Sequence, residues 1–198
     1  MGRPKYSGGA ARPLEAHEIK RLLNITANTG RNRARNTILI KTLLFTAGRI
    51  GEVLHLQVQD VYNGKNILPS LVFRKTKTKT TRRIPINSGF QRDLLTYINE
   101  NGLELDSPLF PSSRITNGSK FINPNAGSLL VKRLLVQAGL GDCSAHSTRK
   151  ASLMALMRSN VNLTTIKTIS GHKSYTSLEH YLSASKTEVN DAIDSLTF

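Results

Sequence analysis

The last third of the chain contains, in this order, His146-Ser147-Thr148-Arg149, Gly171-His172 and Tyr181, and Tyr181 follows His172 by nine residues. The planar guanidinium of arginine matches the oxygens of a phosphate group, and histidine donates or accepts protons near neutral pH. A tyrosine hydroxyl can attack phosphorus and remain bonded to it as a covalent ester. Together these residue types indicate a site that binds a phosphate group and makes it reactive.

Two further cations lie earlier in the chain. Arg49 follows an apolar helical stretch, within Thr46-Ala47-Gly48-Arg49-Ile50-Gly51-Glu52, and Lys77 lies in a segment with six lysines and arginines in ten residues, 74–83. The sequence shows no cluster of carboxylates of the kind that holds magnesium. We therefore expect no metal and no cofactor, and we expect cationic side chains to supply the charge stabilisation that a metal ion gives elsewhere.

This ordered set resembles the motifs of the tyrosine recombinases, also called phage-type integrases. Those motifs are an arginine in a Thr-Gly-x-Arg-x-x-Glu context, a hairpin lysine, His-x-x-Arg, Gly-His, and a tyrosine nine residues after that histidine. Each motif is weak alone, whereas the set with these spacings is specific. The resemblance extends over about residues 13–185 and implies a catalytic domain. It implies that the phosphate-activating residues are Arg49, Lys77, His146, Arg149 and His172, and that the nucleophile is Tyr181.

Two features of the set differ from the family pattern or leave a choice open. Ala47 replaces the glycine that usually precedes the first catalytic arginine. Lys75 and Lys79 point to the same strand face as Lys77, because side chains alternate along an extended strand. Either of them is therefore an alternative for the catalytic hairpin lysine.

The nucleophile also has a competitor. Tyr175 follows His172 by only three residues, which is too few for the family spacing. Tyr181 is therefore the predicted nucleophile. Glu52 is expected to orient Arg49 or a neighbouring helix rather than to take part in the chemistry.

The chain is strongly basic, with 28 lysines and arginines against 13 aspartates and glutamates over 198 residues, a net charge of +15. Such an excess favours a polyanionic partner, which we expect to be double-stranded DNA with specific recombination sites. No apolar run approaches the about 18 residues that cross a bilayer, so we expect no membrane partner. The single cysteine, Cys143, excludes a disulfide framework. The predicted DNA-binding residues are Arg31, Arg33, Arg35, Arg74, Lys75, Lys79, Arg82 and Arg83.

Hydrophobic periodicity predicts a mainly α fold with one small antiparallel β-sheet (α+β), which is also the tyrosine recombinase catalytic-domain fold that the resemblance implies. Two strands, 70–73 and 83–86, are expected to flank the basic segment as a hairpin. The prolines, serines and glycines of 106–127 predict a loop. Helices are expected from Pro13, over 36–45 and 90–98, and at about 126–138, 146–159, 162–170 and 176–182.

We divide the chain into three parts. Residues 1–12 are rich in glycine and cations and are predicted to be a flexible basic arm. Residues 13–185 are the catalytic domain. Residues 186–198 are a tail helix whose apolar stripe packs on a neighbouring protomer or back on its own domain. The helical core-binding domain of most family members has no counterpart, so the chain is either a minimal member or an excised catalytic domain.

The resemblance implies a site-specific DNA recombinase that breaks and rejoins strands through a 3′-phosphotyrosine intermediate, without metal or ATP. It also implies a tetramer on two DNA sites. We expect the protein in the cytoplasm of a prokaryotic cell, associated with the nucleoid, and an origin in a phage, a plasmid or another mobile element stays open. Two alternatives keep the same scaffold. One is a DNA-binding regulator with weak or no recombination, and the other is a type IB topoisomerase-like relaxase.

Overall fold

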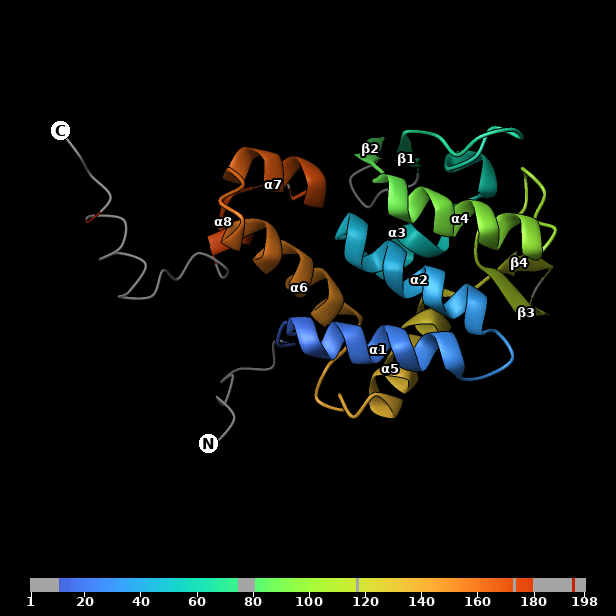
Figure 1. Cartoon of the computed structure of the whole chain (residues 1–198), viewed down its shortest axis with the longest axis horizontal. Coiled ribbons are helices and arrows are strands. Elements are labelled where there is room, and N and C mark those ends of the chain that lie inside the picture. Colours follow the sequence, from blue (N-terminus) through green and yellow to red (C-terminus); the bar gives the residue numbers. More distant parts are fainter. Residues whose placement is uncertain (1–10, 75–80, 117, 173, 180–193, 195–198) are drawn as a thin grey trace.

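The computed structural model describes residues 11–74, 81–116, 118–172, 174–179 and 194. In this part of the chain helices predominate, and the strands form two antiparallel pairs (Figure 1). The mainly α fold with a small antiparallel sheet is confirmed. The helices are α1 (Ala16–Asn28), α2 (Arg33–Thr46), α3 (Ile50–Leu54), α4 (Ser88–Glu100), α5 (Pro124–Gln137), α6 (Ala145–Arg158), α7 (Leu163–Ser170) and α8 (Thr176–Glu179), with a 3-10 turn at Val58–Asp60. The strands are β1 (Ser70–Phe73), β2 (Arg82–Pro85), β3 (Pro111–Thr116) and β4 (Ser119–Phe121).

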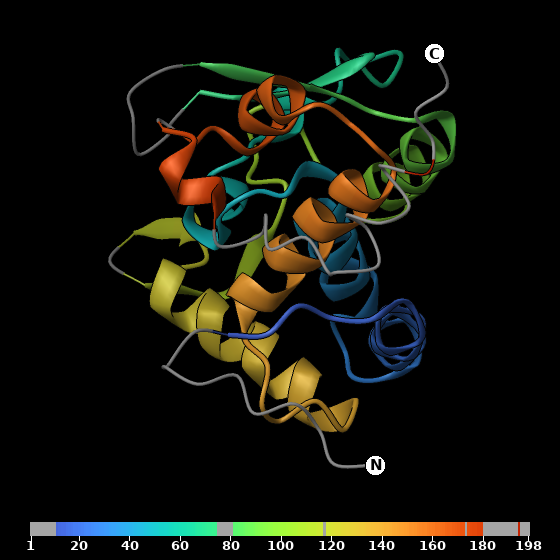
Figure 2. The ribbon, with the colours of Figure 1, turned by 90° about the vertical axis from the view of Figure 1, so that its left-hand side faces the viewer.

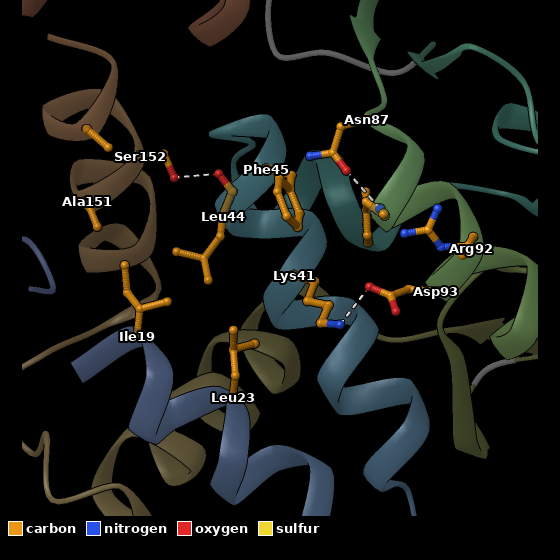
Figure 3. Close-up of a pocket in the computed structure, with 13 residues that line it drawn as sticks. Ile19, Leu23, Lys41, Leu44, Phe45, Asn87, Arg92, Asp93, Ala151 and Ser152 are labelled. Carbon is orange, nitrogen blue, oxygen red and sulfur yellow. Dashed lines mark hydrogen bonds and ion pairs between the residues drawn. The ribbon is translucent and has the colours of Figure 1, made fainter. Parts of the chain in front are cut away.

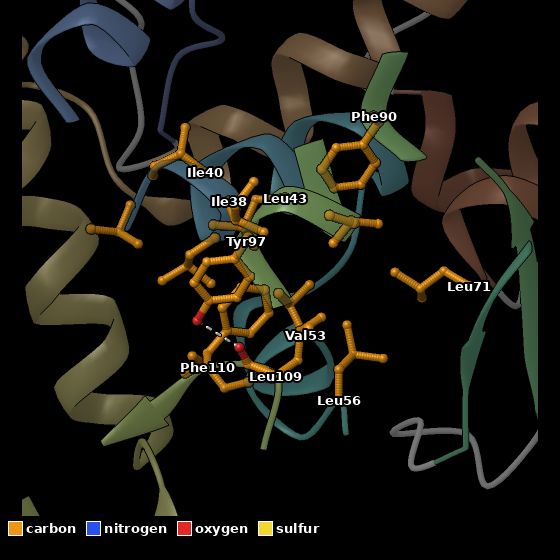
Figure 4. Close-up of a cluster of buried hydrophobic side chains, with 14 of the residues drawn as sticks. Ile38, Ile40, Leu43, Val53, Leu56, Leu71, Phe90, Tyr97, Leu109 and Phe110 are labelled. Carbon is orange, nitrogen blue, oxygen red and sulfur yellow. Dashed lines mark hydrogen bonds between the residues drawn. The ribbon is translucent and has the colours of Figure 1, made fainter. Parts of the chain in front are cut away.

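Helix α2 forms the centre of the core and packs against α1, α4 and α6. Its Leu39, Ile40 and Leu43 are fully buried, and each such side chain contributes roughly 1.5–3 kcal/mol through its removal from water (Figure 4). Tyr97 of α4 is buried beside them and donates its hydroxyl to the carbonyl of Leu109 at 2.9 Å. This packing fixes the C-terminal end of α2, from which the chain continues directly to Arg49.

The hairpin predicted around the basic segment is present at its base. Strands β1 and β2 pair antiparallel, with Phe73 opposite Arg82 and Ser70 opposite Pro85. The predicted second strand begins one residue earlier than expected. Residues 75–80 between the strands, including Lys75, Lys77 and Lys79, lie outside the described residues.

The prediction that 106–127 is entirely loop is wrong. Strands β3 and β4 pair antiparallel within this segment, and Pro111 begins β3, where a missing N–H is tolerated. Turn-forming residues dominate the composition of this segment and hide the pairing, because it depends on a partner strand rather than on local propensity. The residues that the structure describes therefore form two small sheets, where the sequence predicts one.

The helices of the last third begin and end at residues that suit these positions. The side chain of Ser144 accepts a hydrogen bond from the backbone N–H of His146 at the start of α6, and Asn162 caps α7 in the same way. Gly171 ends α7 with φ +67°, a left-handed conformation that favours glycine. Within the described residues, no helix is both long and apolar enough to cross a bilayer.

Figure 2 turns the C-terminal helices α6, α7 and α8 toward the viewer. They gather around the end of α2 through a small apolar cluster in which Ala47 meets Leu153, Ile166 and Leu178. Leu178 is fully buried, so α8 is held against α6 and α7, as the sequence predicts for this leucine. Residues 1–10 of the predicted basic arm, and the tail 186–198 apart from Asp194, lie outside the described residues.

Candidate active site

The turn between α2 and α3 presents the first arginine of the motif set. Ala47 adopts a left-handed conformation with φ 46°, and Arg49 is the residue that caps α3. Gly48 lies between them in a tight space, since a Cβ there would lie 2.7 Å from a methyl group of Val53. The backbone path needs glycine at residue 48, and it turns the carbonyl of Ala47 toward α6.

Arg149 of α6 joins three segments of the site. Its guanidinium is buried and donates from Nη1 to the carbonyl oxygen of Ala47 and from Nη2 to the carbonyl oxygen of Ser170, the latter at 3.0 Å. Nη2 also lies 3.0 Å from Nε2 of His172. The two carbonyls fix the plane of the guanidinium, so it is aligned before any ligand arrives.

His172 lies directly after the left-handed turn at Gly171. Its Nδ1 is 2.7 Å from the hydroxyl of Ser170. Because Arg149 can only donate, Nε2 accepts and Nδ1 carries the proton in this arrangement. Burial and, after it, the positive charges of Arg149, Arg49 and Arg82 together lower the pKa of His172 to about 4. The imidazole is therefore neutral near pH 7.

Arg49 and Glu52 form an ion pair at the mouth of the site. Nη1 of Arg49 lies 2.9 Å from Oε1 of Glu52, and Oε2 of the same carboxylate accepts the backbone N–H of Arg49 at 3.2 Å. The carboxylate is buried, whereas the Arg49 side chain is 30% exposed. Glu52 thus orients Arg49, as the sequence predicts.

His146 is the third candidate catalytic residue that lines this pocket. It is an exposed residue in the first turn of α6, and the pocket that it lines with Arg49 and Arg149 has a volume of about 130 Å³. The structure therefore brings Arg49, His146 and Arg149 to one pocket, and places His172 against the inner side of Arg149. Two guanidiniums and two imidazoles converge where the sequence predicts a phosphate site.

Arg82 corrects a prediction. The sequence predicts that it binds DNA as part of the hairpin, but its side chain is buried. Nη1 donates to the carbonyl of Ser170 at 2.6 Å, Nη2 lies 3.2 Å from Oε2 of Glu52, and the guanidinium lies 4.7 Å from the ring centroid of Phe73. The neighbouring Arg83 is exposed. Side chains alternate along a strand, and this period is the signal that could have separated the two arginines.

The remaining predicted DNA-binding arginines differ in exposure. Arg31 and Arg33 are exposed, whereas Arg35 is partly buried and donates to the carbonyl of Pro111 at 2.8 Å. Arg74 is 58% exposed and forms an ion pair with Asp60. None of these residues lines the pocket that Arg49, His146 and Arg149 form.

The nucleophile and the hairpin lysine cannot be placed. Lys77 and Tyr181 lie outside the described residues, and α8 ends at Glu179, two residues before Tyr181. The alternative, Tyr175, has its hydroxyl 3.2 Å from that of Thr164 and its ring under the Lys167 ammonium. Tyr175 thus packs on the exposed side of α7. No group of three potential metal ligands occurs among the residues that the structure describes.

Comparisons with known proteins agree with these observations. The model of the phage integrase family matches residues 12–188. The tyrosine recombinase XerA of Pyrococcus furiosus is 22% identical over 96% of this chain and 64% of its own. The XerH recombinase bound to its difH substrate has a TM-score of 0.69 at 21% identity, over 92% of this chain and 54% of its own.

The catalytic domain of bacteriophage HP1 integrase has a TM-score of 0.64 at 19% identity, and the match covers 94% of this chain and 95% of that domain. The chain spans about 60% of the length of the curated relatives that it matches. At these identities the structural matches establish the fold alone.

Proposed function

Since the chain belongs to the phage integrase family, we propose that it cleaves and rejoins DNA strands at specific recombination sites. The observation that carries the proposal is the pocket that Arg49, His146 and the aligned Arg149 line together, with His172 in contact with Arg149. Such a pocket suits a scissile phosphate, because planar guanidiniums bind two oxygens at once. A net charge of +15 suits a DNA substrate, and XerH has been solved bound to one.

In the first step Arg49 and Arg149 hold the non-bridging oxygens of the scissile phosphate and stabilise the charge that develops on them. His172, in contact with Arg149, assists in binding the phosphate. The Ser170 hydroxyl beside Nδ1 can donate as well as accept. Once a phosphate oxygen takes the hydrogen bond that Nη2 of Arg149 gives to Nε2, the neutral ring can change tautomer and present Nε2–H to the phosphate. The cations supply the stabilisation, and the proposed step uses no metal or cofactor.

Tyr181 supplies the nucleophile. Its hydroxyl oxygen attacks phosphorus and its proton passes to His146, while the bond to the 5′-oxygen breaks and Lys77 protonates that oxygen. The products are a 3′-phosphotyrosine and a free 5′-hydroxyl. The 5′-hydroxyl of the partner strand then attacks the ester and releases Tyr181, so the number of phosphodiester bonds is conserved without ATP.

The DNA around the scissile phosphate is held by the exposed cations. We assign Arg31, Arg33 and Arg83 to phosphate contacts, with Lys75 and Lys79 of the hairpin. Arg35 and Arg74 contribute charge near the duplex while their hydrogen bonds go to protein groups. We propose, from this substrate, that the protein acts at the nucleoid in the cytoplasm of a prokaryotic cell.

We propose further that the protein acts as a tetramer on two DNA sites, joined through residues 186–198. The tail carries an apolar stripe with three carboxylates and one lysine, whereas the chain as a whole is basic. A groove of about 500 Å³ between α1, α2, α4 and α6 suits it (Figure 3). Phe45 is half exposed in this groove and stacks on Phe90 at 4.8 Å, and Arg92 lies at its rim. We assign the groove to the tail of a neighbouring protomer.

A nicked suicide substrate tests the function, because loss of the cleaved end traps the covalent protein–DNA adduct. We expect the adduct on the wild-type protein, and mass spectrometry should find the modified peptide at Tyr181. Tyr181→Phe should bind DNA and form no adduct, since only the attacking oxygen is removed. Tyr175→Phe is the matched control and should form the adduct normally.

An adduct on Tyr175, or no adduct at all, contradicts the proposal. The second result would favour a DNA-binding regulator. Plasmids with two sites then separate recombination, which gives exchanged products, from relaxation, which changes only supercoiling.

A further inference from the structure

Arg82 is a charged residue next to the phosphate-binding arginines, and the proposed chemistry gives it no role. Its side chain is 9% exposed, and it contacts Ser170, Glu52 and the ring of Phe73 as described above. Its Nε is buried and has no hydrogen-bond partner among the described residues. A buried guanidinium with an unpaired N–H carries a desolvation cost, so stability alone does not explain its presence.

The two acceptors that Arg82 contacts, Glu52 and the carbonyl of Ser170, each have a second cationic partner. Glu52 accepts from Nη1 of Arg49 at 2.9 Å, and the carbonyl of Ser170 accepts from Nη2 of Arg149 at 3.0 Å. Arg82 is therefore linked to each phosphate-binding arginine through one shared acceptor. Because both acceptors keep a donor when Arg82 is replaced, such a variant should fold.

The charges of the pocket indicate what Arg82 does. A phosphodiester carries one negative charge, and a second develops as tyrosine attacks. Arg49 and Arg149 supply two positive charges, but Glu52 lies within 3.2 Å of the first. Arg82 offsets the charge of Glu52, which leaves two net positive charges facing two negative ones. Without Arg82 only one net positive charge would remain.

We propose that Arg82 is a positioning residue of the recombinase site: it holds the Glu52 carboxylate and the Ser170 carbonyl so that Arg49 and Arg149 keep their geometry and their charge for the scissile phosphate. This inference rests on the proposed function of the pocket. The backbone admits the guanidinium at Gly171, where a Cβ would lie 2.3 Å from Nη1 of Arg82. The turn before His172 therefore has room for this arginine only if residue 171 is glycine.

The pKa of His172 reports on the same arrangement, and a change in packing alone would not alter it. Among the described residues, the charged groups that face it are Arg149 from α6, Arg49 and Glu52 from α3 and its cap, and Arg82 from β2. Burial and the arginines together hold its pKa at about 4. Replacing Arg82 removes one positive charge near His172. It also leaves the negative charge of Glu52 less neutralised. Both changes raise the pKa of His172 toward its ordinary value.

The test compares Arg82→Met, Arg82→Lys and Arg158→Met with the wild-type protein. Methionine places an uncharged apolar side chain of similar length beside the ring of Phe73. Lysine keeps the charge but cannot donate to both acceptors at once as a guanidinium does. Arg158 is 62% exposed and lies 3.7 Å from Glu15, so its variant removes the same charge at a site outside the pocket. The measurements are the rate of adduct formation at saturating suicide DNA, the DNA affinity, the melting temperature, and the NMR titration of His172.

We expect Arg82→Met to form the adduct about 10- to 100-fold more slowly, with DNA affinity within about threefold of wild type. Its melting temperature should stay close to that of wild type. Arg82→Lys should retain part of the rate, and Arg158→Met all of it. The pKa of His172 should rise in Arg82→Met and stay unchanged in Arg158→Met.

A wild-type rate in Arg82→Met, or a loss confined to DNA affinity, overturns the inference. Should Arg82→Met unfold, Arg82→Lys decides by the same comparison of rate and affinity. A wild-type protein that forms no adduct contradicts the proposed function instead. In that case the titration of His172 in the DNA-free protein still tests the proposed arrangement of Arg82 around Glu52 and His172. An unchanged pKa of His172 in Arg82→Met would contradict that arrangement.

Discussion

Two groups of three arginines differ in what surrounds them. Arg31, Arg33 and Arg35 lie at the N-terminal end of α2, where the first two are exposed to solvent. The arginines of the pocket lie beyond its C-terminal end, about 20 Å away at 1.5 Å per residue. There, two carbonyls and one carboxylate hold the donors of Arg49, Arg82 and Arg149.

The difference separates affinity from rate. An exposed arginine attracts a phosphate wherever its flexible side chain can reach, so it contributes to binding along the DNA. A guanidinium fixed by carbonyls has already lost its freedom before DNA arrives, and it can stabilise charge that appears only in the transition state. Substitutions at one end of α2 should therefore change binding, and those at the other end should change chemistry.

Arg149→Lys is expected to give the largest effect. Lysine keeps the positive charge but cannot donate at once to the carbonyls of Ala47 and Ser170 while facing a phosphate. We expect adduct formation on suicide DNA to fall by about 10²–10³, with DNA affinity within a few-fold of wild type. Single-turnover kinetics and a binding titration at one salt concentration measure the two quantities.

A melting curve provides the control for folding, since Arg149 is buried. Equal losses of rate and affinity in a folded variant would break the comparison, because the pocket would then act as a binding site only.

Arg31→Gln combined with Arg33→Gln should act in the opposite way and less strongly. Each exposed arginine that contacts a phosphate contributes about 0.9 to the slope of log affinity against log salt, so the double variant should flatten the slope by nearly 2. The adduct rate at saturating DNA should stay unchanged. Titrations at several salt concentrations measure the slope, with Arg158→Gln as the control for loss of surface charge.

An unchanged salt slope would show that this end of α2 lies away from the DNA. A reduced rate at saturating DNA would instead connect the two arginine groups, and the separation of binding from chemistry would fail.

The sequence predicted which residue types meet, because the motif set requires them to converge. Arg49, His146 and Arg149 line one pocket, although 100 residues separate the first from the last. It did not predict that Arg82 turns inward. A period of two shows that Arg82 and Arg83 face opposite sides of a strand, but only the packing of β2 on the core decides which side is buried.

The same reasoning explains the missed strands. Pairing of β3 with β4 is a property of two segments in contact, whereas the composition of 106–127 reports only local preference for turns. Ser170 was also missed, because its main contribution to the site is a backbone carbonyl that accepts from two arginines. A carbonyl is present at every residue, so no residue type marks it.

The smallest expected effect concerns the backbone that aligns Arg149. Ala47 has φ 46°, and a left-handed conformation costs an L-residue roughly 1–2 kcal/mol. Ala47→Gly removes this strain, while glycine adds about 0.4–1 kcal/mol of conformational entropy to the unfolded chain. We therefore expect a net gain of about 0.5–1 kcal/mol in the free energy of unfolding, measured by denaturant titration. The adduct rate should stay within about twofold of wild type, because the carbonyl that accepts from Arg149 is kept.

Gly48→Ala is the matched comparison one residue further on, and its sign should be opposite. A Cβ at residue 48 would lie 2.7 Å from Val53 and 2.8 Å from the hydroxyl of Thr46, so the turn must shift to admit it. We expect a loss of about 1–3 kcal/mol and a slower adduct rate, since the same turn carries the carbonyl that Arg149 uses. Stabilisation by Gly48→Ala would contradict the tight space at residue 48, and an unchanged adduct rate in a destabilised Gly48→Ala would show that the alignment of Arg149 does not depend on this turn.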